Sequence, residues 1–343
     1  MELRLIVSDL DGTLLTDDKK ISPYTRDMLA EAVRRGVCFV PATGRAFDTI
    51  PQEVLELPGV RYVIASNGAA VYELSPCPGS TDDEVRSGLM RGVSIPQGQI
   101  AGQGADGSVC TSVRDSACAP ISDSDRASAD GSVCAQADAR KGRRIYSCLL
   151  DPASVDAMLA LERDGRITYE VLVAGVPYTE KRYVADPAAF GATEFGVRYI
   201  RQTRLGIDGL EEFARAHREE LDAVDFVCAD RVVREAFLAR LRREVPSVSI
   251  TSSIPNLIEV GSERADKGQT LLWLLRHLGI PASQVMTFGD ADNDLAMISG
   301  VTYGVAMGNA SEACRRAAWA VTSTNQEDGV GRMVGRALAR NLL

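Results

Sequence analysis

Near the N-terminus, short apolar runs alternate with a longer segment in which apolar residues recur at helical spacing. The apolar runs are residues 4–8, 37–42 and 61–66, and the helical pattern covers residues 24–35. Near-continuous apolar strands separated by helices are typical of a parallel sheet that is covered on both faces. This part of the chain therefore predicts an α/β fold.

The same alternation resumes near the C-terminus. Helical patterns cover residues 267–278, 295–299 and 312–317, and apolar strands cover residues 285–288, 302–306 and 319–322. Gly279 and Pro281 mark the end of the first of these helices. We therefore expect one core domain, built around a single sheet, from residues 1–74 and 263–343.

The segment between these two parts has strands and helices of its own. The expected strands are residues 145–150, 169–174, 224–229, 248–251 and 257–260, and the expected helices are residues 152–163, 210–218 and 232–244. We predict that residues 143–262 form a second α/β domain with a mixed sheet, inserted into the first.

Residues 75–142 differ in composition from both of these parts. They are rich in Gly, Ser, Ala and Asp, and they repeat Ala-Asp-Gly-Ser-Val-Cys at residues 105–110 and 129–134. Their four cysteines leave two readings open, a metal or redox module and a flexible surface excursion that lengthens a hairpin turn. The irregular spacing favours the excursion, because it cannot fix a ligand cage.

Length and charge narrow the classes of partner. A chain of 343 residues suits two domains. With 38 Lys and Arg against 47 Asp and Glu, the net charge of -9 gives no positive field for nucleic acid or an anionic membrane. The chain has neither an apolar run of about 18 residues nor a C-x-x-C pair. We expect a cytoplasmic protein with reduced thiols and a small-molecule partner; nothing in the sequence predicts an oligomeric state.

The first candidate for chemistry follows the first expected strand. Asp9-Leu10-Asp11-Gly12-Thr13 stands where that strand ends, and open parallel sheets bind ligands beyond the carboxyl ends of their strands. Two carboxylates at i and i+2 can converge on one side, so that one attacks while the other handles protons. An acidic turn is the alternative reading of the same residues.

A second acidic segment follows the strand expected at residues 285–288. Its sequence is Gly289-Asp290-Ala291-Asp292-Asn293-Asp294. Mg²⁺ prefers oxygen ligands from one or two carboxylates, and such a loop supplies them. A helix cap needs only one of these residues, so capping alone does not account for three aspartates and an asparagine.

Two further segments and one lysine carry weaker signals. Thr43-Gly44-Arg45 follows the second strand, where a hydroxyl and backbone amides can hold phosphate oxygens. Ser66-Asn67-Gly68 is a similar polar end to the third strand. Lys267 begins a helix, where the macrodipole disfavours a positive charge. A neighbouring phosphate or carboxylate would explain that lysine.

In this order, the segments resemble the motifs of the haloacid dehalogenase-like superfamily, and most closely its Cof-type phosphatases with a large α/β cap. Residues 9–13 match the first motif, Thr43 in Ala-Thr-Gly-Arg the second, Lys267 the third, and Gly289-Asp290-x-x-Asn293-Asp294 the fourth. Residues 307–310 and 327–330 also resemble that subfamily. The resemblance covers residues 1–74 and 143–340, and residues 75–142 depart from it.

The resemblance implies a Rossmann-like parallel-sheet core with the cap inserted between the second and third motifs. It implies that Asp9 attacks phosphorus to give an aspartyl-phosphate, and that Asp11 protonates the leaving alkoxide and then activates water. It also implies Mg²⁺ between Asp9, the backbone carbonyl of Asp11, and Asp290, with Asp294 as an orienting residue. The implied phosphate-binding residues are Gly12, Thr43, Gly44, Arg45, Lys267 and Asn293, of which Thr43 and Lys267 also count as catalytic.

The function expected from this resemblance is magnesium-dependent hydrolysis of small phosphorylated metabolites, with specificity set by the cap. A phosphomutase on the same core and a catalytically silent metabolite-binding protein are the alternatives. A dehalogenase is disfavoured, because resembling dehalogenases lack the acid at the position of Asp11.

Overall fold

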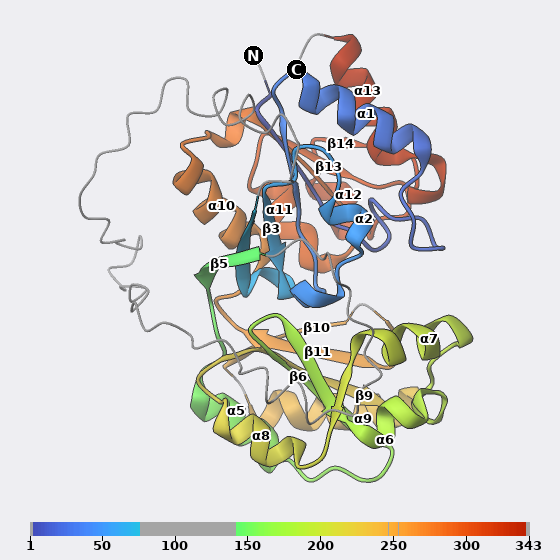
Figure 1. Ribbon diagram of the computed structural model, residues 1–343, viewed down its shortest axis with the longest axis vertical. Helices are drawn as coiled ribbons and strands as arrows, with labels where there is room; N and C mark the ends of the chain where they lie inside the picture. Colours follow the sequence, from blue (N-terminus) through green and yellow to red (C-terminus); the bar gives the residue numbers. More distant parts are fainter. Residues whose placement is uncertain (1–2, 76–141, 246, 253, 341–343) are drawn as a thin grey trace, which may run out of the picture.

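The structure is a computed structural model that describes residues 3–75, 142–245, 247–252 and 254–340 (Figure 1). The insertion expected at residues 75–142 lies outside these residues except for its two end positions, and so do four of the eight cysteines. The other four, Cys38, Cys148, Cys228 and Cys314, are buried thiols. No helix in the described part of the chain is both long enough and apolar enough to cross a membrane.

The larger sheet is built from both ends of the chain, as the α/β expectation requires. Its strand order is β14-β13-β12-β1-β2, and all neighbours are parallel. The strands are β1 (Leu5–Ser8), β2 (Cys38–Pro41), β12 (Val285–Gly289), β13 (Tyr303–Ala306) and β14 (Ala320–Val321). In this register Ser8 lies level with both Phe288 and Pro41, so the carboxyl ends of three strands meet at one edge. The predicted fold class is confirmed.

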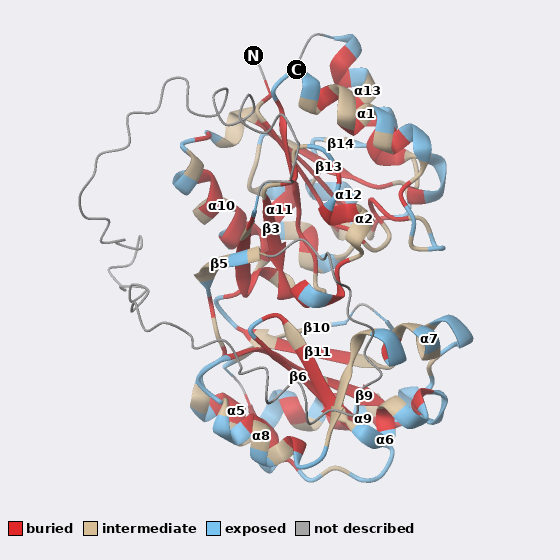
Figure 2. Cartoon of the chain, in the orientation of Figure 1, coloured by how far each residue is buried: buried red, intermediate tan, exposed pale blue. Residues whose placement is uncertain are grey.

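Helices cover both faces of this sheet. On one face, α1 (Pro23–Arg34) and α13 (Gly329–Ala339) pack against each other and onto alternate strand residues such as Ile6. On the other face, α10 (Lys267–Leu278) and α11 (Leu295–Ser299) bury Leu5 and Val7. The interior between these layers is buried in Figure 2. Shorter helical elements are α2 (Gln52–Leu55), α12 (Glu312–Ala317), η1 (Phe47–Thr49), η2 (Ser66–Gly68), η4 (Ala282–Gln284), η5 (Asp292–Asp294) and η6 (Asn325–Glu327).

A three-stranded antiparallel sheet continues beside β2. It consists of β3 (Tyr62–Ala65), β4 (Ala70–Leu74) and β5 (Gly142–Ser147). Isolated parallel bridges at Phe39↔Val60 and Ala42↔Ile64 join it to β2. The strand expected at residues 145–150 begins at Gly142 and pairs with β4, which confirms the hairpin that residues 75–142 were expected to lengthen. It therefore belongs to this sheet and not to the sheet of the inserted domain, in which it had been counted.

The second large sheet has the order β10-β11-β9-β6-β7-β8. Its neighbours are antiparallel except for the parallel pair β7 and β8, so it is mixed. The strands are β6 (Ile167–Val173), β7 (Val176–Glu180), β8 (Leu205–Ile207), β9 (Leu221–Cys228), β10 (Val248–Thr251) and β11 (Leu257–Ser262). The hydrophobic pattern did not reveal β7 and β8, which are short.

Helices cover one face of this sheet, and Figure 1 shows its other face turned toward the domain that contains the parallel sheet. The covering helices are α5 (Pro152–Ala160), α8 (Leu210–Ala216) and α9 (Arg231–Glu244), which bury strand residues such as Phe226 and Ile258. Three elements that the sequence had not predicted lie at one end: α6 (Lys181–Ala185), η3 (Pro187–Phe190) and α7 (Glu194–Thr203). This domain is called the cap below.

Candidate active site

The carboxyl ends of β1 and β12 bring two of the predicted acidic segments together. Asp9 directly follows β1, and its backbone N–H donates to the carbonyl of Phe288 in β12 at 3.0 Å. Carboxylate oxygens of Asp9, Asp290 and Asp294 lie within 4.8 Å of one another. Segments that are about 280 residues apart in sequence thus form one carboxylate cluster.

Lys267 lies inside this cluster. Asp266 caps α10 by accepting from the N–H of Gln269 at 2.8 Å, and this places Lys267 at the first helical position. Its Nζ donates to Asp9 Oδ1 at 2.6 Å and to Asp294 Oδ1 at 2.7 Å, and only 1% of the residue is exposed. Although burial favours the neutral amine, the two carboxylates raise the pKa of Lys267 above its ordinary value.

The carboxyl groups of this cluster repel one another. Burial, together with the charges of Asp294 and Asp290, raises the pKa of Asp9 well above its ordinary value despite Lys267. Burial also raises the pKa of Asp290 to about 6, with a contribution from Asp294 and against the hydrogen bond from Thr13. Closely spaced oxygens that resist ionisation together fit a hard divalent cation, which would neutralise them.

Asp294 fixes the loop that carries Asp290. It is fully buried, and its Oδ2 accepts the backbone N–H groups of Asp290 at 3.0 Å and Ala291 at 3.1 Å. Thr13 Oγ1 donates to Asp290 Oδ1 at 2.8 Å. These contacts hold the loop of Asp290 beside Asp9.

Gly12 allows the first motif to approach Asp290. Its φ of +85° is in the left-handed region, and a Cβ there would lie 2.5 Å from Asp290 Oδ2. Asn309 Nδ2 donates to the Gly12 carbonyl at 2.8 Å. Any side chain at this position would therefore push the two acidic segments apart.

Asp11 has different partners from Asp9. Arg45 donates from Nε to Asp11 Oδ2 at 2.6 Å and from Nη2 to Oδ1 at 2.7 Å, and Lys19 Nζ lies 2.7 Å from Oδ1. Burial alone would raise the pKa of Asp11, but Arg45 and Lys19 hold it well below its usual range. Arg45 Nη1 also donates to the Tyr199 hydroxyl of the cap at 3.3 Å.

The remaining predicted residues form a polar edge beside these two clusters. Thr43 Oγ1 accepts the Arg45 backbone N–H at 3.1 Å. Asn293 Nδ2 donates to Asn67 Oδ1 at 2.9 Å, and a Cβ on Gly44 would lie 3.0 Å from that same oxygen. The segments that follow β2, β3 and β12 therefore meet at this edge.

Sequence reasoning missed Lys19 and Tyr199. Lys19 lies in an acidic turn, and no periodicity or motif marks it. Tyr199 belongs to α7, a helix that the sequence had not predicted. Its ring lies between two guanidinium groups, with Arg45 Cζ 5.1 Å and Arg204 Cζ 4.9 Å from its centroid.

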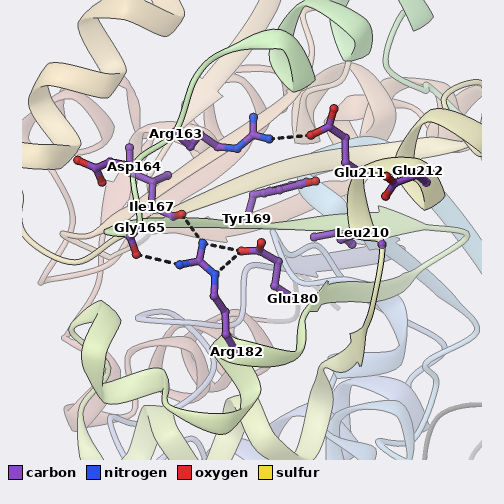
Figure 3. A pocket seen from close by; sticks show the side chains of 11 residues that line it. Arg163, Asp164, Gly165, Ile167, Tyr169, Glu180, Arg182, Leu210, Glu211 and Glu212 are labelled. Carbon is purple, nitrogen blue, oxygen red and sulfur yellow. Dashed lines mark hydrogen bonds and ion pairs between the residues drawn. The ribbon is translucent and has the colours of Figure 1, made fainter.

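A surface pocket of about 400 Å³ lies elsewhere, on the cap (Figure 3). It contains none of the predicted site residues. Its two arginines face carboxylates, since Arg182 Nη2 lies 2.7 Å from Glu180 Oε2 and Arg163 Nη2 lies 3.5 Å from Glu211 Oε2. The strand-end carboxylates, rather than this pocket, are therefore the candidate site.

Known proteins of similar sequence show the family of this chain. The model of the haloacid dehalogenase-like hydrolase family matches residues 6–76 and 124–334. The chain belongs to this family. A Haemophilus influenzae protein that carries a provisional phosphatase name is 42% identical, over 96% of each chain. Phosphatase YwpJ of Bacillus subtilis is 26% identical, over 98% of this chain and all of that one.

The fold is shared with solved members of the family. A haloacid dehalogenase-like hydrolase from Bacteroides thetaiotaomicron superposes with a TM-score of 0.66 at 22% identity, over 98% of this chain and 99% of the other. The resemblance to this superfamily is thus confirmed, and family membership together with the named relatives identifies the chain as a phosphatase.

Proposed function

We propose that this enzyme hydrolyses small phosphate monoesters with the help of Mg²⁺, and that Asp9 is its covalent nucleophile. The observation that carries the proposal is the buried contact of Lys267 with both Asp9 and Asp294, beside Asp290. A lysine held there balances carboxylates and attracts a phosphate dianion to the nucleophile.

The residues that would hold Mg²⁺ are the side chains of Asp9 and Asp290 and the backbone carbonyl of Asp11. Oxygen ligands of this kind are those that Mg²⁺ prefers, and the raised pKa of Asp290 reflects a carboxyl group that is buried beside other carboxylates. When bound, the ion would screen the repulsion between phosphate and carboxylate. Asp294 already binds Lys267 and two backbone N–H groups, which suits it to support rather than ligation.

In the first half of the proposed reaction, a carboxylate oxygen of Asp9 bonds to phosphorus while the bond from phosphorus to the leaving oxygen breaks. The Asp11 carboxyl gives its proton to that oxygen. In the second half, the Asp11 carboxylate takes a proton from water as the water attacks the aspartyl-phosphate, and Asp9 is restored. Lys267, the Thr43 hydroxyl and the Asn293 amide would hold the phosphate oxygens, with Gly12 and Gly44 leaving room.

Arg45 and Lys19 control whether the carboxyl group of Asp11 is ionised or protonated. In the structure they hold Asp11 ionised, whereas the first step needs its proton. A bound phosphate would compete for the same two cations, because it is a dianion close to them. Weaker pairing lets the pKa of Asp11 rise, so that the acid forms only when substrate is present.

The decisive test is Asp9→Asn, with Asp292→Asn as the matched control. Asp292 belongs to the same acidic loop but is exposed and contacts Ser311. We expect Asp9→Asn to lower phosphate release from a panel of phosphate esters at least about 1000-fold without unfolding the protein, because an amide cannot attack phosphorus. Turnover within tenfold of the parent enzyme would sink the covalent mechanism.

A further inference from the structure

Three carboxylates lie side by side across the cap sheet. Glu259 of β11 pairs directly with Asp225 of β9, and Asp225 pairs directly with Glu170 of β6. Side chains at such positions are about 5 Å apart and point to the same face. Like charges placed directly opposite each other destabilise a sheet, so this arrangement works against the stability of the cap.

This carboxylate row lies on the face that the cap helices leave uncovered. The strand neighbours Tyr169, Phe226 and Ile258 point to the opposite face and pack into the core beneath α5, α8 and α9. Leu172 and Ala223, which share the face of the row, pack against Ala46, the residue just before the 3-10 helix that follows the Thr43 motif. The row therefore lies on the face of the cap sheet that is turned toward the parallel-sheet core in Figure 1.

Contacts at both ends of the row lead to the active site. At one end, Glu259 accepts a long hydrogen bond from Thr251 at 3.4 Å, and Thr251 accepts one from Asn67 at 3.5 Å. At the other end, Arg204 Nε lies 3.0 Å and 3.1 Å from the oxygens of Glu170. Arg204 stacks on Tyr199, which contacts Arg45.

The row contains an acceptor that no protein group satisfies. Oδ1 of Asp225 is buried and has no hydrogen-bond partner among the described residues. Burial, and then the charges of Glu259 and Glu170, raise the pKa of Asp225 well above its ordinary value, although the charge of Arg204 and a hydrogen bond from the backbone N–H of Val260 to the carboxyl group lower it. A buried acceptor without a donor is destabilising, so a ligand that supplies a donor would stabilise this position.

We propose that Glu170, Asp225 and Glu259 recognise the leaving group of the substrate by accepting hydrogen bonds from its hydroxyl groups. The substrate class is then a polyhydroxylated phosphate monoester without a second anionic group, because the carboxylate row repels such a group. This inference rests on the proposed function and specifies the substrate of the same site. The phosphate end binds beside Lys267, and the hydroxylated end points to the cap.

The test uses two pairs of substrates that differ by a carboxylate. They are glucose 6-phosphate with 6-phosphogluconate, and glycerol 3-phosphate with 3-phosphoglycerate; p-nitrophenyl phosphate has no hydroxyl groups to recognise. The variants are Asp225→Ala and Asp225→Asn. The control is Asp156→Asn, whose side chain is 46% exposed and pairs with arginines on the helix-covered side of the cap.

In the parent enzyme we expect kcat/KM to be at least about tenfold higher for the member of each pair that lacks the carboxylate. The other member would place an unpaired anion against the carboxylate row. Asp225→Ala should lower kcat/KM for the member that lacks the carboxylate about 10-fold or more, should lower it much less for p-nitrophenyl phosphate, and should narrow the ratio within each pair. Asp225→Asn should narrow the ratio as well. The thermal midpoint of both variants should equal or exceed that of the parent, while Asp156→Asn changes none of these values.

An equal loss on p-nitrophenyl phosphate, an unchanged ratio within the pairs, or a lower thermal midpoint in both Asp225 variants would overturn the assignment, since each means that Asp225 supports the cap instead of recognising substrate. A parent enzyme that hydrolyses none of the five esters would overturn the proposed function itself. If the parent enzyme hydrolyses p-nitrophenyl phosphate and the Asp225 substitutions leave the kcat/KM ratio within each pair unchanged, this inference alone is overturned.

Discussion

Arg45 engages both carboxylate oxygens of Asp11, with Nε 2.6 Å from Oδ2 and Nη2 2.7 Å from Oδ1. Such a forked pair favours the ionised carboxylate strongly. Asp9, by contrast, shares Lys267 with Asp294, and burial raises its pKa. Two aspartates that are two residues apart therefore have opposite pKa shifts, which suits them to different proposed roles.

Asp11→Asn should separate the two proposed half-reactions. Asparagine can neither protonate a leaving group nor accept a proton from water, but p-nitrophenolate leaves without needing a proton. We expect a burst of about one equivalent of p-nitrophenol per active site, followed by turnover about 100-fold or more below the parent enzyme, because the aspartyl-phosphate accumulates. Rapid-mixing absorbance measures both phases.

The controls for this burst are Asp9→Asn, which should show none, and Asp292→Asn, which should behave as the parent enzyme does. A slow Asp11→Asn enzyme without a burst would contradict a role for Asp11 in the second half-reaction. A burst of equal size with an alkyl phosphate would contradict its role as the acid.

Asp290 should make the metal-free protein less stable as the pH rises. Its pKa in the folded protein is about 6, above its usual value near 3.9 in an unfolded chain, so the folded state binds more protons between these values. The free energy of unfolding therefore falls as the pH rises through about 4 to 6. Asp290→Asn removes this fall, and we expect the variant to gain about 1–2 kcal/mol more at pH 7.5 than at pH 4 relative to the parent.

Urea unfolding in the presence of a chelator measures this difference, with Asp292→Asn as the exposed control. Added Mg²⁺ should then stabilise the parent protein more than Asp290→Asn, since a ligand that binds only the folded state stabilises it. The same pH dependence in the parent and the variant, or the same stabilisation by Mg²⁺, would show that Asp290 is not part of the proposed ion site.

Gly175 lies where the cap contacts the core, and we expect this contact to position the cap. It lies in the turn between β6 and β7 with a φ of +86°, and a Cβ there would lie 2.5 Å from the Tyr72 hydroxyl and 2.9 Å from Phe47 Cβ. Its carbonyl accepts the Asp48 N–H at 3.0 Å, and its N–H donates to Asp222 Oδ2 at 3.0 Å. Gly175→Ala therefore strains the backbone and forces the turn away from the core.

Gly36→Ala is the matched control, because Gly36 has a φ of +90° but no atom within 4 Å of an added Cβ. We expect this control to lose about 1–2 kcal/mol of stability through backbone strain alone and to keep its activity. Gly175→Ala should lose more stability and at least about tenfold in kcat/KM, because a displaced cap misplaces the substrate by an ångström or more. Equal kcat/KM in the two variants would show that the turn does not position the cap.

The parallel core could be predicted from the sequence because its signals are local. Apolar runs mark the strands, and polar motifs mark the strand ends that the sheet register then aligns, as Ser8 and Phe288 show. Cross-domain contacts have no such local signal: the contact of Arg45 with Tyr199 depends on how α7, which was not predicted from the sequence, lies against the core.

The carboxylate row could be predicted from the sequence only in part. Acidic residues interrupt the apolar sequences of its strands, with one in β6, one in β11, and two, Asp222 and Asp225, in β9, which is a visible signal. The sequence does not give the register that sets Glu170, Asp225 and Glu259 side by side, because pairing between strands so far apart in sequence is fixed by tertiary packing. The pairing of β5 with β4, by contrast, could be expected from the sequence, because the two strands flank residues 76–141 as the arms of one hairpin.

The last prediction concerns residues 75–142. Their flanks are adjacent in space, because Leu74 of β4 pairs directly with Gly142 of β5. Replacing residues 81–139 with a short Gly-Ser turn closes the same hairpin, and the cost of loop closure changes only slowly with length. We expect the shortened protein to fold and to keep its thermal midpoint within a few degrees and much of its phosphatase activity.

A second variant, with Ser in place of Cys77, Cys110, Cys118 and Cys134, tests the alternative reading of this segment as a metal or redox module. Thermal unfolding and the full substrate panel should be measured for both variants and for the parent enzyme. If the deletion loses much stability, or if activity collapses for the best substrate alone, the segment takes part in folding or in substrate selection. If the serine variant shows the same loss as the deletion, the cysteines cause it, because the backbone of the segment is then intact and only its thiol ligands are missing.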